Sequence, residues 1–144
     1  MDIFFYGLFM DLELLQSHGI VPLEVRLVYA RDHAIQIGRR AYLKPQSGRR
    51  AYGMAMNLSI ADIRRLYEGE SVRDYQPVAI PVVESAHKYG TMTCYNLTGV
   101  PEGDKPNPEY ARSLANLVRA LGLPESYARE IDLFASPDRV GSHG

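Results

Sequence analysis

The strand-forming segments of this sequence come in groups and do not alternate one by one with helical segments. Apolar or alternating stretches predict strands at 2–6, 24–37, 40–43, 51–58, 77–83 and 91–97. Apolar residues at helical spacing, with suitable caps, predict helices at 11–17, 59–68, 107–121 and 125–134. A doubly wound parallel sheet would require strict alternation. The order therefore predicts an α+β fold in which a curved mixed sheet or small barrel is flanked by helices.

Prolines mark several of the expected boundaries. Pro77 and Pro81 interrupt a β-branched strand, which points to an edge position or a bulge, because proline has no N–H for the ladder. Asn107-Pro108-Glu109 combines a cap, a proline at the first helical position and an acid in the first turn. The helix that starts there is expected to end at Gly122, before Pro124.

Length and composition indicate one ordinary globular domain. The chain has 144 residues, of which 46% are hydrophobic and 23% charged, and domains commonly span about 100–200 residues. We assign residues 1–135 to a single domain and expect residues 136–144 to form a flexible C-terminal tail. The formal net charge of −1 gives no general attraction to nucleic acid or anionic membrane, so neither partner is predicted.

The single cysteine, Cys94, excludes an internal disulfide and a cysteine-based zinc site. Together with the lack of an apolar run of about 20 residues and of a basic leader, this favours a cytoplasmic location. Cys94 is either a small buried hydrophobe or a nucleophile, and free cysteines are more commonly buried. The four histidines are isolated and do not have the spacing of metal ligands.

A basic segment stands out between residues 39 and 50. Residues 44–50 are expected to form a loop, because they contain proline, serine and glycine. The basic residues are Arg39, Arg40, Lys44, Arg49 and Arg50, with no acidic residue among them. One interpretation is an anion site for a carboxylate or a phosphate. The other is a solvated hairpin tip, which runs of charge form more often.

A turn at Tyr6–Met10 is the first candidate for a binding site. It leaves an apolar strand and enters a polar segment, and its glycine lets successive backbone N–H groups converge on one point. Such a group of donors binds a carboxylate. An ordinary strand-to-helix turn explains the same residues equally well.

The second candidate is Glu68, in the segment Leu66-Tyr67-Glu68-Gly69 at a predicted helix end. A glutamate there faces the unfavourable end of the helix dipole. With partial burial, its carboxylate would readily accept a proton, which suits a general base. The alternative is an exposed glutamate that merely caps the helix, which is the commoner case.

These residues together resemble the γ-glutamylcyclotransferase-like superfamily, which includes γ-glutamylcyclotransferase, γ-glutamylamine cyclotransferase and the plant AIG2-like proteins. Its opening signature is a strand ending in Tyr-Gly, matched here by Tyr6-Gly7-Leu8-Phe9. Its acidic signature is Glu-Gly at a helix end with a tyrosine seven residues after the glutamate, matched by Glu68-Gly69 and Tyr75. Further similarity is found at Tyr95 and at 106–110 with 122–127. The resemblance runs from about residue 3 to residue 134.

The resemblance implies a small mixed-sheet β-barrel flanked by helices, and an enzyme that cyclises a γ-glutamyl group. The substrate's α-amine attacks its own γ-carbonyl, 5-oxoproline forms, and an amine, amino acid or peptide leaves. Glu68 acts as general base and then as general acid, and backbone N–H groups hold the α-carboxylate. The implied substrate-binding residues are Tyr6, Gly7, Leu8, Phe9, Tyr75, Tyr95 and Tyr110. No metal or organic cofactor is implied, and a homodimer follows by analogy.

The chain departs from the superfamily pattern at three positions. Leu8 stands where serine or threonine is usual, Phe9 where an aliphatic residue or asparagine is usual, and Arg64 where leucine is usual. Losing one hydrogen bond to a charged group costs about 1.5–3 kcal/mol, so either the hydroxyl is dispensable or the substrate differs. The alternative function is a non-catalytic relative that binds a small anionic metabolite or a protein partner. A different lyase or acyl-transfer reaction in the same pocket also stays open.

Overall fold

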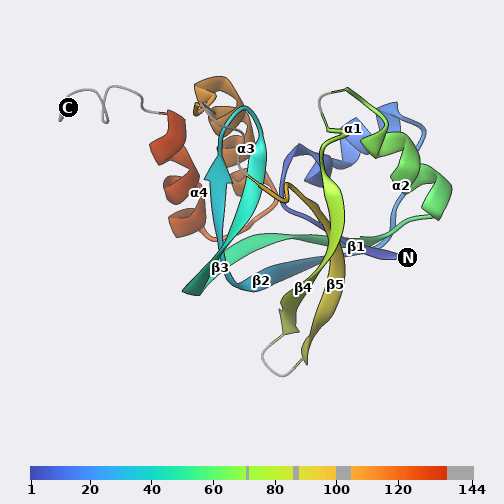
Figure 1. Cartoon of the computed structure of the whole chain (residues 1–144), viewed down its shortest axis with the longest axis horizontal. Coiled ribbons are helices and arrows are strands. Elements are labelled where there is room, and N and C mark those ends of the chain that lie inside the picture. Colours follow the sequence, from blue (N-terminus) through green and yellow to red (C-terminus); the bar gives the residue numbers. More distant parts are fainter. Residues whose placement is uncertain (71, 86–87, 100–104, 136–144) are drawn as a thin grey trace.

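A closed β-barrel lies between two groups of helices in the computed structural model (Figure 1). The structure describes residues 1–70, 72–85, 88–99 and 105–135, and the predicted tail lies outside them. The strands are β1 (Asp2–Phe5), β2 (Leu23–Ile37), β3 (Ala41–Asn57), β4 (Gln76–Ser85) and β5 (Lys88–Asn96). The helices are η1 (Leu8–Met10), α1 (Leu12–Ser17), α2 (Ile60–Tyr67), α3 (Pro108–Ala120), α4 (Glu125–Asp132) and η2 (Leu133–Ala135). In Figure 1, α3 and α4 lie to one side of the barrel, and α1 and α2 lie to the other.

The strand order around the barrel is β1-β3-β2-β4-β5. Neighbouring strands are antiparallel except for β1 and β5, which run parallel and close the barrel where Ile3 meets Thr93. This mixed barrel with flanking helices confirms the predicted fold class. Closure leaves β1 as a short central element rather than an exposed edge.

The long hairpin of β2 and β3 corrects the prediction of a loop at 44–50. The chain reverses earlier, at Gly38–Arg40, and β3 continues through the segment. The pairing passes from Arg31 with Arg50 to His33 with Pro45, so residues 46–49 bulge opposite Asp32. The N–H of Gly48, at a φ of +80°, donates to the Asp32 side chain over 2.9 Å. The proline and glycine therefore mark a bulge that bends a strand, and not a chain reversal.

The prolines of β4 confirm the edge interpretation over most of this strand. β4 pairs with β5 along its length but meets β2 only at Val82 and Val83. Pro77 and Pro81 lie opposite Tyr95 and Thr91 of β5, outside the short ladder with β2. The missing N–H of these prolines costs little, because no other described strand pairs with β4 at these two positions.

Side-chain caps fix the predicted helix starts. Asp11, Ser59 and Asn107 accept hydrogen bonds from the backbone N–H groups of Glu13, Asp62 and Tyr110. These bonds satisfy donors that the first helical turn leaves unpaired. At the other end of α3, Gly122 adopts a φ of +79°, as expected for a terminating glycine. No helix among the described residues has the length and apolarity to cross a bilayer.

The core of the barrel is built around β1, where Ile3, Phe4 and Phe5 are at most 2% exposed. Cys94 of β5 is also fully buried, and burial raises the pKa of its thiol to about 12. A thiol that stays protonated at neutral pH is a poor nucleophile. The interpretation of Cys94 as a buried hydrophobe is therefore confirmed.

The buried β1 strand carries Tyr6 and Gly7 to one end of the barrel, where the candidate site lies.

Candidate functional site

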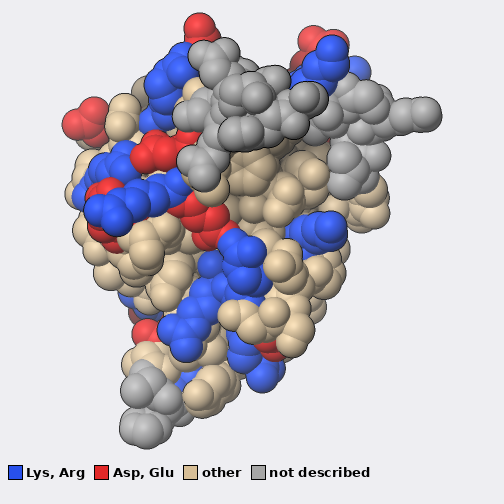
Figure 2. Space-filling model, turned by 90° about the vertical axis from the view of Figure 1, so that its left-hand side faces the viewer, with Lys and Arg blue, Asp and Glu red and all other residues tan. Residues whose placement is uncertain are grey.

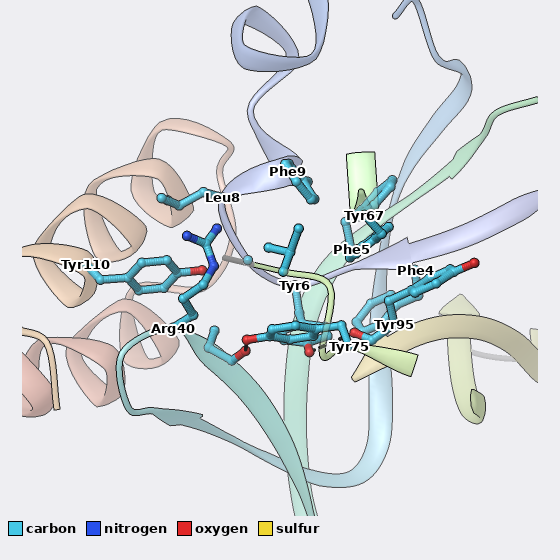
Figure 3. Close-up of a pocket in the computed structure, with 13 residues that line it drawn as sticks. Phe4, Phe5, Tyr6, Leu8, Phe9, Arg40, Tyr67, Tyr75, Tyr95 and Tyr110 are labelled. Atoms are coloured by element: carbon cyan, nitrogen blue, oxygen red, sulfur yellow. Dashed lines mark hydrogen bonds between the residues drawn. The ribbon is translucent and has the colours of Figure 1, made fainter. Parts of the chain in front are cut away.

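A pocket opens at the end of the barrel where β1 leaves it (Figure 3). The empty space within it is about 360 Å³, which includes open solvent at the mouth. The lining comes from β1, the turn after it with η1, the β2–β3 turn, the start of β3, α2, the segment after α2, β5 and α3. The residues are Phe4, Phe5, Tyr6, Gly7, Leu8, Phe9, Arg40, Ala41, Tyr67, Val72, Tyr75, Tyr95 and Tyr110. Every residue predicted to bind substrate thus lines this one pocket.

The turn after β1 forms one wall. Gly7 is the N-cap of η1, and the first N–H groups of such a helix have no partner within it. A Cβ on Gly7 would lie 2.8 Å from the Tyr110 hydroxyl oxygen, closer than side chains pack. Glycine therefore lets this hydroxyl approach the backbone of the turn. The convergence of the turn's N–H groups on one point stays a prediction, and the Tyr110 hydroxyl lies beside this turn.

Tyr110 enters the pocket from the first turn of α3, which Asn107 caps. Burial raises the pKa of Tyr110, and the Arg40 guanidinium and the backbone amides of Leu8 and Ala41 oppose that rise. The guanidinium carbon of Arg40 lies 5.3 Å from the centroid of the Tyr110 ring. The phenol is therefore neutral at physiological pH and lies close to both the turn and the Arg40 guanidinium.

An aromatic wall faces the turn. Tyr67 and Tyr95 stack with their centroids 4.1 Å apart and an interplanar angle of 13°. Phe9 meets Tyr67 edge-on at 5.4 Å and 88°, and Phe5 meets Phe9 at 6.1 Å and 82°. Burial also holds the pKa of Tyr67 well above its usual value. The pocket is thus lined largely by rigid, uncharged rings.

Hydrogen bonds fix the tyrosines at the base of the pocket. The Tyr6 hydroxyl lies 2.9 Å from the Tyr95 carbonyl oxygen and 3.0 Å from Asn96 Oδ1. The Tyr75 hydroxyl donates to the Ala41 carbonyl oxygen over 2.5 Å. Asn96 also accepts from the Leu43 N–H (2.9 Å) and donates to the Leu43 carbonyl oxygen (3.0 Å). Its amide therefore joins β5 to β3 beneath Tyr6.

Replacing Asn96 by leucine should destabilise the protein by about 2–4 kcal/mol, because the N–H and the carbonyl oxygen of the buried Leu43 both lose the Asn96 amide as their partner. Chemical denaturation measures this change. Asn57→Leu is the comparison, because the Asn57 side chain donates to Asp2 at the surface and lies at the other end of β3. Equal losses for both variants would contradict a special role for the Asn96 amide.

Glu68 lies outside the set of lining residues. It is the C-cap of α2 and its side chain is exposed, so the expected partial burial is wrong. Ile63, Leu66 and Tyr67 form the face of α2 that packs inward. Position 68 lies about 100° around the helix axis from Tyr67, which turns the Glu68 side chain away from this inward face. Its role as general acid and base stays a prediction.

The basic segment at 39–50 has two interpretations, an anion site or a solvated hairpin tip, and its residues divide between the two. Arg40 lines the pocket, because the chain reverses at Gly38–Arg40 rather than at 44–50. Arg49 instead forms an ion pair with Glu130 of α4, and Arg50 lies 4.6 Å over the Tyr29 ring. Figure 2 shows basic side chains in a band across the middle of this face, with acidic and basic groups mixed above it. Most of the segment is therefore solvated surface.

Sequence reasoning missed Tyr67, Arg40 and Asn96 as individual site residues. Tyr67 precedes Glu68 directly, so its place in the acidic signature was the available signal. Arg40 and Asn96 carry no local signal, because their roles depend on where the β2–β3 turn and the end of β5 meet. Among the residues that the structure describes, no group of three or more His, Cys, Asp or Glu is placed to hold a metal ion.

Comparison with known proteins gives a fold match without a sequence match. No protein-family model matches the chain, and no curated protein sequence is significantly similar to it. Solved structures do match. A protein described as "Gamma-glutamyl cyclotransferase" has a TM-score of 0.75 at 18% identity, covering 91% of this chain and 85% of that one.

Two further structures give the same result. The human protein loc79017 has a TM-score of 0.73 at 19% identity, covering 90% of this chain and 85% of that one. YkqA from Bacillus subtilis has a TM-score of 0.74 at 16% identity, covering 94% of this chain but 54% of that one. At sequence identities this low, the structural matches establish the architecture of the fold and leave the activity open. The protein has the γ-glutamylcyclotransferase-like fold that the sequence resemblance predicted.

Proposed function

We propose that this protein is an enzyme that releases 5-oxoproline from a γ-glutamyl amine, amino acid or peptide. The substrate's α-amine and γ-carbonyl are already tethered, so binding in a folded conformer supplies much of the rate enhancement. The backbone N–H groups of the Gly7–Phe9 turn hold the α-carboxylate. The aromatic wall of Tyr67 and Tyr95 limits the space, which favours a folded over an extended substrate.

In the proposed reaction, Glu68 takes a proton from the α-ammonium group and frees the amine for attack. A bond forms between this nitrogen and the γ-carbonyl carbon, and the bond from that carbon to the leaving nitrogen breaks. Glu68 then returns this proton to the leaving nitrogen, and the ring nitrogen releases its second proton to solvent, so that 5-oxoproline forms as a neutral lactam. No covalent intermediate with the protein is required.

The observation that supports this proposal is the meeting of distant segments at one pocket. Residues predicted from the resemblance, from Tyr6 to Tyr110, line the same cavity in a fold that matches a γ-glutamyl cyclotransferase. Glu68 follows Tyr67, which lines the pocket, so the backbone next to Glu68 is at the pocket wall. The proposal requires the exposed Glu68 side chain to turn towards the pocket when substrate binds.

A second candidate function is binding of a small anionic metabolite without turnover. The described lining contains no carboxylate, and Leu8 stands in place of the usual hydroxyl. A pocket that keeps its donors but has no base at its wall would still bind an anion. Binding without turnover differs from the proposed enzymatic function only in whether Glu68 transfers a proton.

The test is chromatographic detection of 5-oxoproline after incubation with γ-glutamyl-alanine, γ-glutamyl-ε-lysine and glutathione. We expect release from at least one compound, and the preferred compound identifies the leaving group. Release from none of them by folded protein, together with binding of 5-oxoproline, would favour the non-catalytic candidate.

A further inference from the structure

Arg40 is the charged side chain in the described lining of the pocket. The other lining residues are apolar, glycine or tyrosine. Among the residues that the structure describes, no carboxylate forms an ion pair with Arg40, and its guanidinium lies over the ring of Tyr110. A cation in an otherwise uncharged, mainly aromatic cavity gives the cavity a positive potential. The electrostatics of the pocket therefore favour an anionic ligand.

The position of Arg40 identifies the part of the pocket that would hold the anion. Its guanidinium lies over the Tyr110 ring, and the Tyr110 hydroxyl reaches the turn at Gly7. Figure 3 shows the guanidinium beside the hydroxyl end of Tyr110, on the side of Leu8. The cation and the backbone N–H groups of the turn therefore meet at the same end of the pocket.

We propose that Arg40 binds a carboxylate of the ligand at this end of the pocket and selects acids over the corresponding amides. A guanidinium offers two parallel N–H donors that match the two oxygens of a carboxylate. Leu8 offers no side-chain hydroxyl at this end, and Arg40 supplies a charged donor in its place. Only the identity of the acid rests on the proposed function: it is the α-carboxylate of a γ-glutamyl compound or of 5-oxoproline.

The experiment compares 5-oxoproline with its uncharged amide as ligands, by titration of ¹⁵N-labelled protein. We expect the wild-type protein to bind the acid at least about tenfold more tightly than the amide, with shifts at Gly7 and at the Arg40 side-chain N–H. Arg40→Gln should bind both equally weakly. Arg40→Lys should recover part of the preference, because it keeps the charge without the paired donors.

Arg39→Gln is the matched control, because Arg39 lies in the same turn but is exposed and outside the lining. It should keep the full preference for the acid. The proposal is overturned if Arg40→Gln keeps the preference for the acid. It is also overturned if the wild-type protein binds the acid no more tightly than the amide, or binds neither. Selection through Arg40 without release of 5-oxoproline from any γ-glutamyl compound would reject the proposed reaction alone. Release with a selectivity independent of Arg40 would reject the carboxylate site alone.

Discussion

Replacing Glu68 by glutamine is expected to lower the rate of 5-oxoproline release by about 10²- to 10⁴-fold, the usual contribution of a general acid–base group. Glutamine keeps the size of the side chain but neither accepts nor returns the proton. KM should change little, because the proposed contacts to the substrate carboxylate come from other residues. Steady-state kinetics with the preferred γ-glutamyl compound measures both parameters.

Glu70→Gln provides the matched control for Glu68→Gln. Glu70 lies two residues further on, its side chain is 90% exposed, and its carboxylate makes a long contact of 3.8 Å with Arg73. It should retain full activity. Because Glu68 is also exposed at a helix end, neither variant should lower the melting temperature appreciably. Full activity of Glu68→Gln would show that another group moves the proton.

Replacing Gly53 by alanine should destabilise the protein by about 3 kcal/mol or prevent folding. A Cβ at Gly53 would lie 2.1 Å from the carbonyl oxygen of Phe5 and under 3 Å from the Phe4 ring. β1 cannot move away, because Phe4 and Phe5 are at most 2% exposed and pair with β3. Thermal unfolding should show a melting temperature lower by roughly 10 °C.

Gly90→Ala separates this clash from the general effect of removing a glycine. Gly90 is an exposed residue of β5, and a Cβ there would meet nothing within 4 Å. This variant should differ from the wild type by less than about 1 kcal/mol. A similar loss in both variants would contradict the close approach of β1 to β3.

Local patterns in the sequence were sufficient for most of the secondary structure. Asp11, Ser59 and Asn107 cap their helices as predicted, because a cap is a contact between residues three or fewer positions apart. The segment 44–50 was misread for the converse reason. Proline and glycine suit both a loop and a bulge, and the pairing of β2 with β3 decides between them.

The sequence also determined the members of the candidate site that belong to recognisable motifs. The turn after Tyr6 and the tyrosines at 75, 95 and 110 line one pocket, as the resemblance implied. Each of these residues belongs to a short segment whose type and order are readable along the chain. The exposure of Glu68 is different, because it depends on which face of α2 packs inward.

Only the tertiary structure decided the roles of Arg40, Asn96 and Gly53. Arg40 entered the pocket because the chain reverses next to it, and Asn96 joined β5 to β3 because the barrel closes. Gly53 is required because the Phe5 carbonyl oxygen and the Phe4 ring of β1 lie too close for a Cβ at this position of β3. Their roles come from contacts between residues more than 40 positions apart, in the cases of Gly53 with Phe5, Arg40 with Tyr110 and Asn96 with Leu43. Propensity and spacing describe neighbours along the chain, whereas such contacts exist only once the barrel has closed.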